Sequence, residues 1–324
     1  MRVDDNHSTF QVETPGKLNL FLEVLRKRED GFHEIETLMM AVSIYDTLYF
    51  TANSEGKLKF GCNWASGMEV SPAALGAEQV APLGDLPRDG RNIVWKALEC
   101  FRQAAGVESG ATVRLIKRIP TASGLGGASS DAAAVLVAAN RVWEVGWTQQ
   151  RLSKLAADLG SDIPFFLSSG PHGNPIGICR GRGERIEMVP CMTRLHFVIV
   201  RPPVGLSTPA VYAGCSPTQQ PVAVAPLVEA LQRGSFRDLG CMLRNRLESA
   251  AEKLSPWVER LRSEFAKLHM VGHQMTGSGS GYFGICRHAH HARRSAGLLR
   301  AARIGHVFHV TSTSPSCRIS RIPA

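Results

Sequence analysis

Residues 120–143, PTASGLGGASSDAAAVLVAANRVW, constrain this chain more than any other stretch, because they join closely spaced glycines to the start of an apolar helix. Gly124, Gly126 and Gly127 have no Cβ and can adopt positive φ, so an anionic oxygen can approach several backbone N–H groups at once. The free N–H groups and the dipole of the first helical turn favour a phosphate by about 0.3–2 kcal/mol. The stretch therefore predicts an anion-binding loop.

Two well-known nucleotide-binding loops do not fit this stretch. A Walker A loop needs a lysine and hydroxyl pair after its second glycine, and that pair is missing. A dinucleotide fingerprint needs a last glycine where Ser129 stands, and no clear acidic ribose ligand follows about twenty residues on. Ser129, Ser130 and Asp131 instead open the predicted helix. On glycine content alone, a flexible connector before a well-capped helix remains an alternative.

Length, hydropathy and cysteine usage limit the class of protein. The 324 residues fit two domains of about 150 residues each. No apolar run approaches the ~18 residues of a membrane span, and the start, MRVDDNHSTF, lacks the features of a signal or transit peptide. Eight cysteines without a C-x-x-C pair predict reduced thiols, and support neither disulfides nor a zinc site. We therefore expect a cytoplasmic protein with no membrane partner.

The net charge of +9 is concentrated near the end of the sequence. From Arg287 onward there are seven arginines and no acidic residue, which leaves the preceding 286 residues with +2. A general RNA-binding surface is therefore a weak hypothesis, and we expect no nucleic-acid partner. The HAHH cluster at residues 288–291 has no standard tetrahedral ligand spacing and is better explained as a solvated surface.

Strands are predicted at residues 10–14 and 17–25, and the second has two different faces. One face carries Leu18, Leu20 and Leu22, and the other carries Lys17, Asn19 and Phe21. A lysine and an asparagine on one face of an apolar strand indicate that this face borders a polar cavity. An edge strand with a solvated face is the alternative.

Two later stretches place polar or aromatic groups beside predicted element ends. Phe32 and His33 follow a charged turn and could stack on a flat base and hydrogen-bond its edge, or serve as a core ring and a cap. Asp162 follows a predicted helix at 148–159, and Pro164 is expected to force the chain out of helical geometry. Asp162 is well placed to hold one orientation, although an Asx-turn would explain it too.

Periodicity and turn signals divide the rest of the chain. Strands are predicted at residues 45–51, 111–117, 195–200, 271–276, 282–286 and 306–311. Helices are predicted at residues 92–106 and 255–269, as a short start within 201–212, and from residue 287. Residues 65–90 predict a long loop, and the Gly- and Pro-rich segment 170–183 predicts a domain boundary near its start. Residues 279–284 match G-x-G-x-x-G, but the strand after them argues against a nucleotide fingerprint.

The order of these motifs resembles the GHMP kinases, a family of small-molecule kinases whose phosphate loop reads P-x-x-x-G-L-G-(S/G)-(S/A)-S. The shared stretches are PGKLNLFL, KREDGFHE, PTASGLGGASSDAA, GSDIPFF, GRGERI, STPAVY and MTGSGSGYF. The resemblance covers nearly the whole chain. It implies an α+β fold, with a ribosomal-protein-S5-like ATP-binding domain at 1–168 and a ferredoxin-like substrate domain at 169–324.

Within that family, KREDGFHE is the most specific stretch. It resembles members that use ATP to phosphorylate the 2-hydroxyl of a cytidine diphosphate methylerythritol in non-mevalonate isoprenoid synthesis. The resemblance also implies Mg²⁺ and a monomer or homodimer. Two alternatives remain: another kinase of the family acting on homoserine or a mevalonate-type alcohol, and a non-catalytic nucleotide-binding or RNA-associated protein on the same scaffold.

The resemblance implies roles for individual residues. Asp162 would accept the hydroxyl proton, and Lys17 would orient the hydroxyl and offset charge on the transferring phosphoryl group. The positions that match the nucleotide site are Asn92, Lys117, Pro120, Gly124, Leu125, Gly126, Gly127, Ser129 and Ser130. Ser130 is also the candidate Mg²⁺ ligand. The positions that match the substrate site are Asn19, Phe32, His33, Thr208 and Tyr212, with Phe32 and Tyr212 as the rings on either side of the cytosine.

Overall fold

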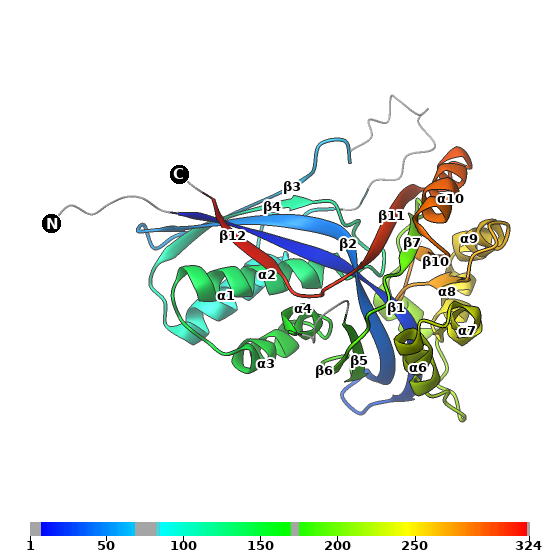
Figure 1. The fold of residues 1–324 in the computed structure, drawn as a ribbon. Helices are drawn as coiled ribbons and strands as arrows, with labels where there is room; N and C mark the ends of the chain where they lie inside the picture. The colour runs from blue at the N-terminus through cyan, green and yellow to red at the C-terminus, as the bar shows by residue number, and fades with distance from the viewer. Residues whose placement is uncertain (1–7, 69–82, 84, 170–174, 323–324) are drawn as a thin grey trace.

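A long antiparallel hairpin is the spine of the molecule (Figure 1). The computed structural model describes residues 8–68, 83, 85–169 and 175–322. Strands β1 (Thr9–Lys27) and β2 (His33–Asn53) pair over nearly their whole lengths and pass through both halves of the molecule. The hairpin explains how residues early in the chain reach a site between the two halves.

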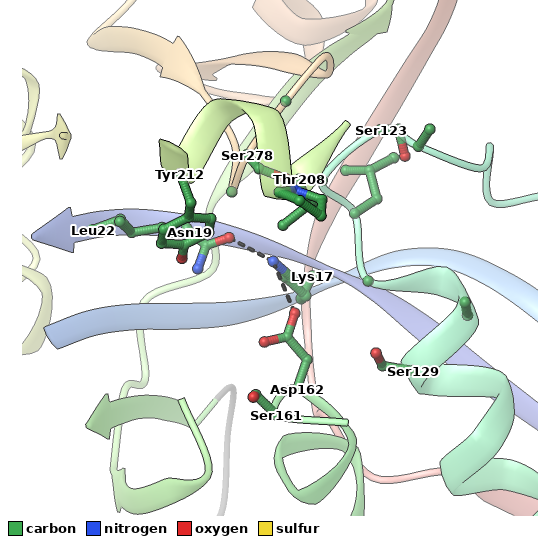
Figure 2. Close-up of a pocket in the computed structure, with 18 of the residues that line it drawn as sticks. Lys17, Asn19, Leu22, Ser123, Ser129, Ser161, Asp162, Thr208, Tyr212 and Ser278 are labelled. Atoms are coloured by element: carbon green, nitrogen blue, oxygen red, sulfur yellow. Dashed lines mark hydrogen bonds and ion pairs between the residues drawn. The ribbon is translucent and has the colours of Figure 1, made fainter. Parts of the chain in front are cut away.

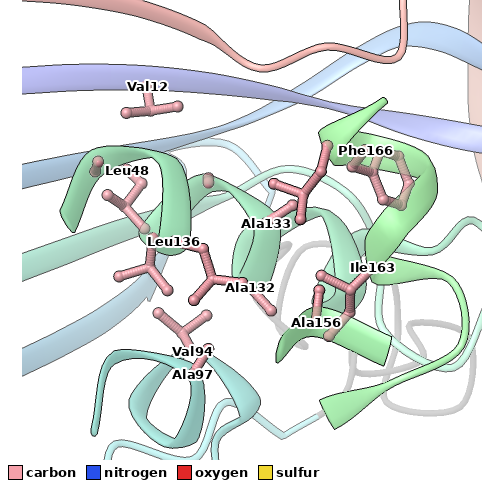
Figure 3. Packing of buried hydrophobic residues seen from close by; sticks show 14 of the residues in the cluster. Val12, Leu48, Val94, Ala97, Ala132, Ala133, Leu136, Ala156, Ile163 and Phe166 are labelled. Carbon is pink, nitrogen blue, oxygen red and sulfur yellow. The ribbon is translucent and has the colours of Figure 1, made fainter. Parts of the chain in front are cut away.

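The first half is a sheet with helices on one face (Figure 1). The strands beside the hairpin are β3 (Leu58–Trp64), β4 (Gly110–Lys117) and β12 (Arg318–Ile322). The helices are α1 (Ile93–Ala105), α2 (Gly127–Val142), α3 (Gln149–Leu159) and α4 (Ile163–Leu167). Helix α2 is central because its alanine-rich surface, including Ala132 and Ala133, allows close packing on its neighbours (Figure 3).

The second half contains an antiparallel sheet in the order β11, β7, β10, β9. These strands are β7 (His196–Arg201), β9 (Gly272–Met275), β10 (Tyr282–Cys286) and β11 (His306–Thr313). The helices of this half are α5 (Thr208–Ala213), α6 (Ala225–Arg233), α7 (Phe236–Met242), α8 (Glu248–Leu254), α9 (Pro256–Ala266) and α10 (Ala289–Ala301). A two-residue strand, β8 (Arg244–Asn245), pairs in parallel with β1.

Strands from late in the chain return to the hairpin. Strands β5 (Ile176–Gly181) and β6 (Arg185–Val189) extend the sheet from β2. The last residues of β11 also pair with β2, and β12 pairs with the outer edge of β1. Segments after residue 169 therefore complete the sheet of the first half. The predicted domain division at residue 169 stays a prediction.

Most predicted elements are confirmed, and several local predictions are wrong. The two predicted N-terminal strands are one strand, with an irregularity between Pro15 and Gly16. Helix α2 begins at Gly127, before the predicted serines. Pro164 lies in the first turn of α4, where a missing N–H costs nothing, so a new short helix begins there after the extended residue Gly160.

A bulge at Leu20 also corrects the predicted faces of β1. Asn19 pairs with Met39 and Phe21 with Leu38, so Leu20 is an extra residue in the ladder. As a result Phe21 turns into the core, while Leu22 joins the cavity-lining side with Lys17 and Asn19.

Other predictions concern thiols, membranes and loops. All eight cysteines are free thiols. Within the described part of the chain, each helix is too short or too polar to cross a bilayer. Most of the predicted 65–90 loop, and residues 170–174 at the predicted boundary, lie outside the described residues.

Candidate active site

A cavity of about 630 Å³ lies where the two halves meet the hairpin. Its wall brings together the glycine loop, the start of α2, the turn before α4, the middle of β1 and helix α5 (Figure 2). Segments from very different parts of the chain therefore face one another across a space large enough for a small-molecule ligand.

Lys17 lies at the centre of this wall (Figure 2). Its Nζ is 3.3 Å from an Asp162 carboxylate oxygen and donates a hydrogen bond of 2.6 Å to Asn19 Oδ1. The Lys17 side chain is 4% exposed, whereas that of Asp162 is 29% exposed. The amide and the carboxylate hold the ammonium in place, and the carboxylate remains accessible from the cavity.

The glycine loop passes directly over Lys17. The Lys17 backbone N–H donates to the Leu125 carbonyl at 2.9 Å, which joins the loop to β1. Gly126 has φ of 70°, and a Cβ built on it would lie 2.9 Å from Lys17 Cγ. A side chain at this position would be strained and would displace Lys17. The glycine is needed for the close approach of loop and lysine.

A second lysine lies on the other side of the loop. Lys117 lines the cavity, but its ammonium pairs with two buried carboxylates, Asp46 and Asp131, the latter at 2.6 Å. Burial lowers the pKa of Lys117, but the charges of Asp131 and Asp46 outweigh burial and raise the pKa above its usual value. Asp46 also accepts the backbone N–H groups of Arg118 and Ile119. The cluster therefore shapes the turn that leads into the glycine loop.

Two predicted nucleotide-site residues lie away from the cavity wall. Ser130 is fully buried; its hydroxyl donates to the Pro15 carbonyl at 2.6 Å and contacts the Thr14 hydroxyl. In this structure the Ser130 hydroxyl is engaged by Pro15 and Thr14, and its role in binding phosphate or Mg²⁺ stays a prediction. Asn92 caps α1 through Val94 N–H and donates to the Pro87 carbonyl, so its role in adenine binding stays a prediction.

The remaining predicted residues all lie in the cavity wall. Those of the loop are Pro120, Gly124, Leu125, Gly126, Gly127 and Ser129, and those of the predicted substrate side are Asn19, Phe32, His33, Thr208 and Tyr212. The rings of His33 and Tyr212 lie 5.2 Å apart with an interplanar angle of 31°. Phe32 is 50% exposed, and the Arg182 guanidinium lies 4.8 Å from its ring centroid.

Burial sets the protonation of two of these groups. Burial lowers the pKa of His33, and the nearby Lys27 charge adds to this effect, so the ring is neutral at pH 7. Burial also raises the pKa of Tyr212, which keeps its hydroxyl protonated. This side of the cavity can therefore offer a neutral imidazole and a phenol to a polar ring.

Sequence reasoning missed one wall of the cavity. Gly277, Ser278 and Gly279 line it, and the Ser278 hydroxyl lies 2.7 Å from that of Thr208. The glycines of residues 277–281 are closely spaced, but the strand that follows them argues against a nucleotide fingerprint. The glycines serve close packing instead, since a Cβ on Gly281 would collide with the Ser123 carbonyl. Arg182 and Lys27 were also missed.

Among the described residues there is no group of three or more His, Cys, Asp or Glu side chains that could hold a metal ion. Mg²⁺ bound by ATP does not require such a cage, because it keeps waters and binds mainly to phosphate oxygens. Asp162 and Ser129 are among the oxygen donors that the cavity wall presents. These oxygen donors fit a magnesium ion that arrives with the nucleotide.

Comparisons with known proteins agree with this geometry. Residues 92–170 match the sequence model for the GHMP kinases N terminal domain, and residues 227–297 match that for the GHMP kinases C terminal domain. A 4-diphosphocytidyl-2-C-methyl-D-erythritol kinase of Pelotomaculum thermopropionicum is 38% identical over 88% of this chain and 91% of its own length. One from Rhodopirellula baltica is 32% identical over 90% and 91%.

Solved structures show the same fold. A crystal structure of 4-(cytidine 5'-diphospho)-2C-methyl-D-erythritol kinase has a TM-score of 0.71 and 32% identity, covering 93% of this chain and 98% of that one. A homoserine kinase from Cytophaga hutchinsonii also has a TM-score of 0.71, with 18% identity and coverage of 99% and 100%. At that identity the second likeness shows the fold alone.

Proposed function

This chain belongs to the 4-diphosphocytidyl-2-C-methyl-D-erythritol kinase family of GHMP kinases, and on that premise we propose that it is an alcohol kinase that uses ATP. It transfers the terminal phosphoryl group of ATP to the 2-hydroxyl of 4-diphosphocytidyl-2-C-methyl-D-erythritol. The observation that carries the proposal is the pairing of Lys17 with Asp162 beside the glycine loop. The same cavity contains the His33–Tyr212 ring pair, which suits a cytosine.

The Lys17–Asp162 pair is the proposed reaction centre. Asp162 accepts the proton of the attacking hydroxyl, and its ion pair with Lys17 holds the carboxylate in place in the cavity wall. The Lys17 ammonium offsets the negative charge that the transferring phosphoryl group carries. Phosphoryl transfer through a loose transition state needs little activation of the nucleophile, so positioning by this pair contributes most.

ATP is the co-substrate, and the glycine loop is the proposed site of its phosphates. The loop lies at the N-terminus of the sixteen-residue helix α2, where backbone N–H groups and the helix dipole favour an anion. Mg²⁺, when bound with ATP, would neutralise phosphate charge, and Ser129, in the cavity wall in the first turn of α2, is the residue placed to hold it. The loop keeps the phosphates next to Lys17 through the Leu125 carbonyl.

On the substrate side, we propose that Tyr212 and Phe32 contact the two faces of the cytosine. The Phe32 ring is half-exposed, with the Arg182 guanidinium 4.8 Å from its centroid, so part of its surface is open to a bound ring. His33 is placed to read the edge of the base, and Asn19 and Thr208 lie toward the erythritol or diphosphate. The cytoplasmic location and the monomer or homodimer expected from sequence stay predictions.

Incubation of the purified protein with Mg-ATP and each of three alcohols tests the proposal. The alcohols are 4-diphosphocytidyl-2-C-methyl-D-erythritol, homoserine and mevalonate, and the phosphorylated product is identified by mass spectrometry. We expect product only from the cytidylated alcohol. Turnover of homoserine or mevalonate alone would overturn the substrate assignment while keeping the kinase.

A further inference from the structure

We propose that Asn245 is a positioning residue for the phosphoryl-transfer site, because its side-chain amide holds in place the Gly277–Gly279 wall of the cavity. This inference rests on the proposed function for its main assay. Asn245 itself does not line the cavity. It acts through the segment 276–281, which follows β9 and contacts most parts of the site.

The amide of Asn245 is fully committed to backbone groups. Its Nδ2 donates to the carbonyls of Met275 and Gly277, both at 2.8 Å, and its Oδ1 accepts the Leu247 N–H at 3.1 Å. The two donor hydrogens thus bind the last carbonyl of β9 and a carbonyl two residues further along the same segment. Asparagine suits this position because a carboxylate has no donor in place of the amide N–H₂.

Two arginines fix the strand that carries Asn245. Glu23, fully buried on β1, accepts hydrogen bonds from Arg244 at 2.7 Å and from Arg246 at 2.6 Å. Burial raises the pKa of Glu23, but the bonds from Arg246 and Arg244 outweigh burial and leave the pKa below its usual value. Because neighbouring residues of a strand face opposite ways, Asn245 points away from Glu23 toward the 276–281 segment.

The segment 276–281 contacts the glycine loop closely. Ser280 N–H donates to the Ala122 carbonyl at 3.3 Å, and Gly281 N–H donates to the Ser123 carbonyl at 3.1 Å. A Cβ on Gly124 would collide with the Thr276 carbonyl. A shift of this segment would therefore shift the proposed phosphate site.

The same segment contacts the proposed substrate side. The Thr276 hydroxyl accepts the Asn19 N–H at 3.1 Å, and the Ser278 hydroxyl lies 2.7 Å from that of Thr208 on α5. Asn19 in turn accepts the hydrogen bond from Lys17. One amide outside the cavity therefore supports both the nucleotide loop and the residues around the reacting hydroxyl.

Asn245→Asp removes both donors and puts a carboxylate against two carbonyl oxygens. Because a misplacement near 1 Å can cost about 100-fold in rate, we expect kcat/KM for both substrates to fall by about 10-fold or more. Asn140→Asp is the matched control. Asn140 lies at the far end of α2, where its amide donates to the Trp147 carbonyl at 3.0 Å and accepts the Trp147 N–H at 2.8 Å. Both variants should lower the Tm, but only Asn245→Asp should lower kcat/KM.

The double variant Asn245→Asp with Ser278→Ala tests whether Asn245 acts through the segment. We expect its kcat/KM loss to be smaller than the product of the single losses, because both changes disturb one contact chain. Multiplicative losses, wild-type kcat/KM in Asn245→Asp, or equal kcat/KM losses in Asn245→Asp and Asn140→Asp would each overturn the inference.

A wild-type protein that phosphorylates none of the alcohols would remove the proposed function but not this inference. The affinity for Mg-ATP, measured by calorimetry, then becomes the readout. It should fall several-fold in Asn245→Asp and stay unchanged in Asn140→Asp, and equal affinities in the two variants would contradict the role given to Asn245.

Discussion

Two buried lysines lie on opposite sides of the glycine loop, and they differ in what surrounds their ammonium groups. Lys17 contacts one carboxylate, which is 29% exposed, and one amide oxygen. Lys117 contacts two carboxylates, Asp46 and Asp131, that are 0% and 2% exposed. The two lysines have nearly the same exposure, 4% and 3%.

The difference lies in the balance of charge rather than in burial. The Lys117 cluster contains two acids for one base, and among the described residues Asp131 Oδ1 has no hydrogen-bond partner. Burial and the neighbouring Asp46 raise the pKa of Asp131 well above its usual value. The Lys117 ammonium, held by two buried acids, therefore has a structural role. The Lys17 ammonium, with one accessible acid, can respond to an incoming phosphate.

The largest expected effect separates chemistry from stability at the Lys17 side. Asp162→Asn should lower kcat by about 10²–10⁴-fold, because the neutral amide can neither accept the hydroxyl proton nor position the hydroxyl and Lys17 by its charge. Mg-ATP affinity should hardly change, and Tm should fall only modestly, since the amide oxygen can still accept a hydrogen bond from the buried Lys17 ammonium. Steady-state kinetics and calorimetry provide the measurement, and Asp158→Asn, an exposed position on α3, is the control. Full activity of Asp162→Asn would remove the proposed proton acceptor.

The second prediction removes each ammonium in turn and compares the losses of stability and activity. Lys117→Met leaves two buried acids without a cation and should lower the free energy of unfolding by about 3–5 kcal/mol. Lys17→Met should cost much less stability, because its acid partner reaches solvent, but should abolish most activity. Urea unfolding and kinetics on both variants give the two profiles. Equal losses of stability would show that the two lysines have the same role.

The third prediction concerns the loop between the lysines. Gly126→Ala introduces a side chain at a φ of 70°, which costs about 1–2 kcal/mol, and it also meets Lys17 Cγ. Gly146→Ala is matched, because its φ is 68° but no atom lies within 4 Å of the added Cβ. Both variants should lose stability in urea unfolding, and Gly126→Ala should lose more because of the added contact with Lys17. Only Gly126→Ala should lose activity as well, and a similar loss of activity in Gly146→Ala would argue against a contact effect.

The smallest expected effect concerns His33. The causes that shift its pKa are burial and the charge of Lys27, and no carboxylate is among them. Burial, with the charge of Lys27, holds the pKa of His33 below 6.5, so the neutral ring predominates above that pH and protonation begins only as pH falls past the lowered value. KM for the cytidylated alcohol should therefore be flat near pH 7 and rise a few-fold at acid pH. His33→Gln should remove that rise, and an unchanged pH profile in the variant would assign the rise to another group.

Local patterns in the sequence were enough for the reaction centre but not for its support. Lys17 and Asp162 stood out because each occurs within a motif and beside a predicted element end. Asp46 could not be linked to Lys117, because 71 residues separate them and only the β2–β4 pairing brings them together. The burial of Ser130 could not be predicted, because its position in the motif says nothing about the direction of its hydroxyl, which depends on the first turn of α2.

Features that depend on strand register were also hidden. The bulge at Leu20 changes which side chains of β1 face the cavity, and it leaves no mark in the alternating pattern of leucines. Asn245 gave no signal either, because its role follows from β8 pairing with β1, far away in sequence. Helices were easier, since capping residues such as Thr148 and Gly106 are local.

The pairing of β12 with β1 has a consequence for how the protein is made in the cell. Residues 318–322 lie along the outer edge of residues 9–13, so this edge of β1 cannot pair until residues 318–322 have been synthesised. Until then the hairpin presents an unpaired edge that can recruit other nascent chains. Chaperone demand during synthesis should therefore fall in a circular permutant in which β12 is translated just before β1.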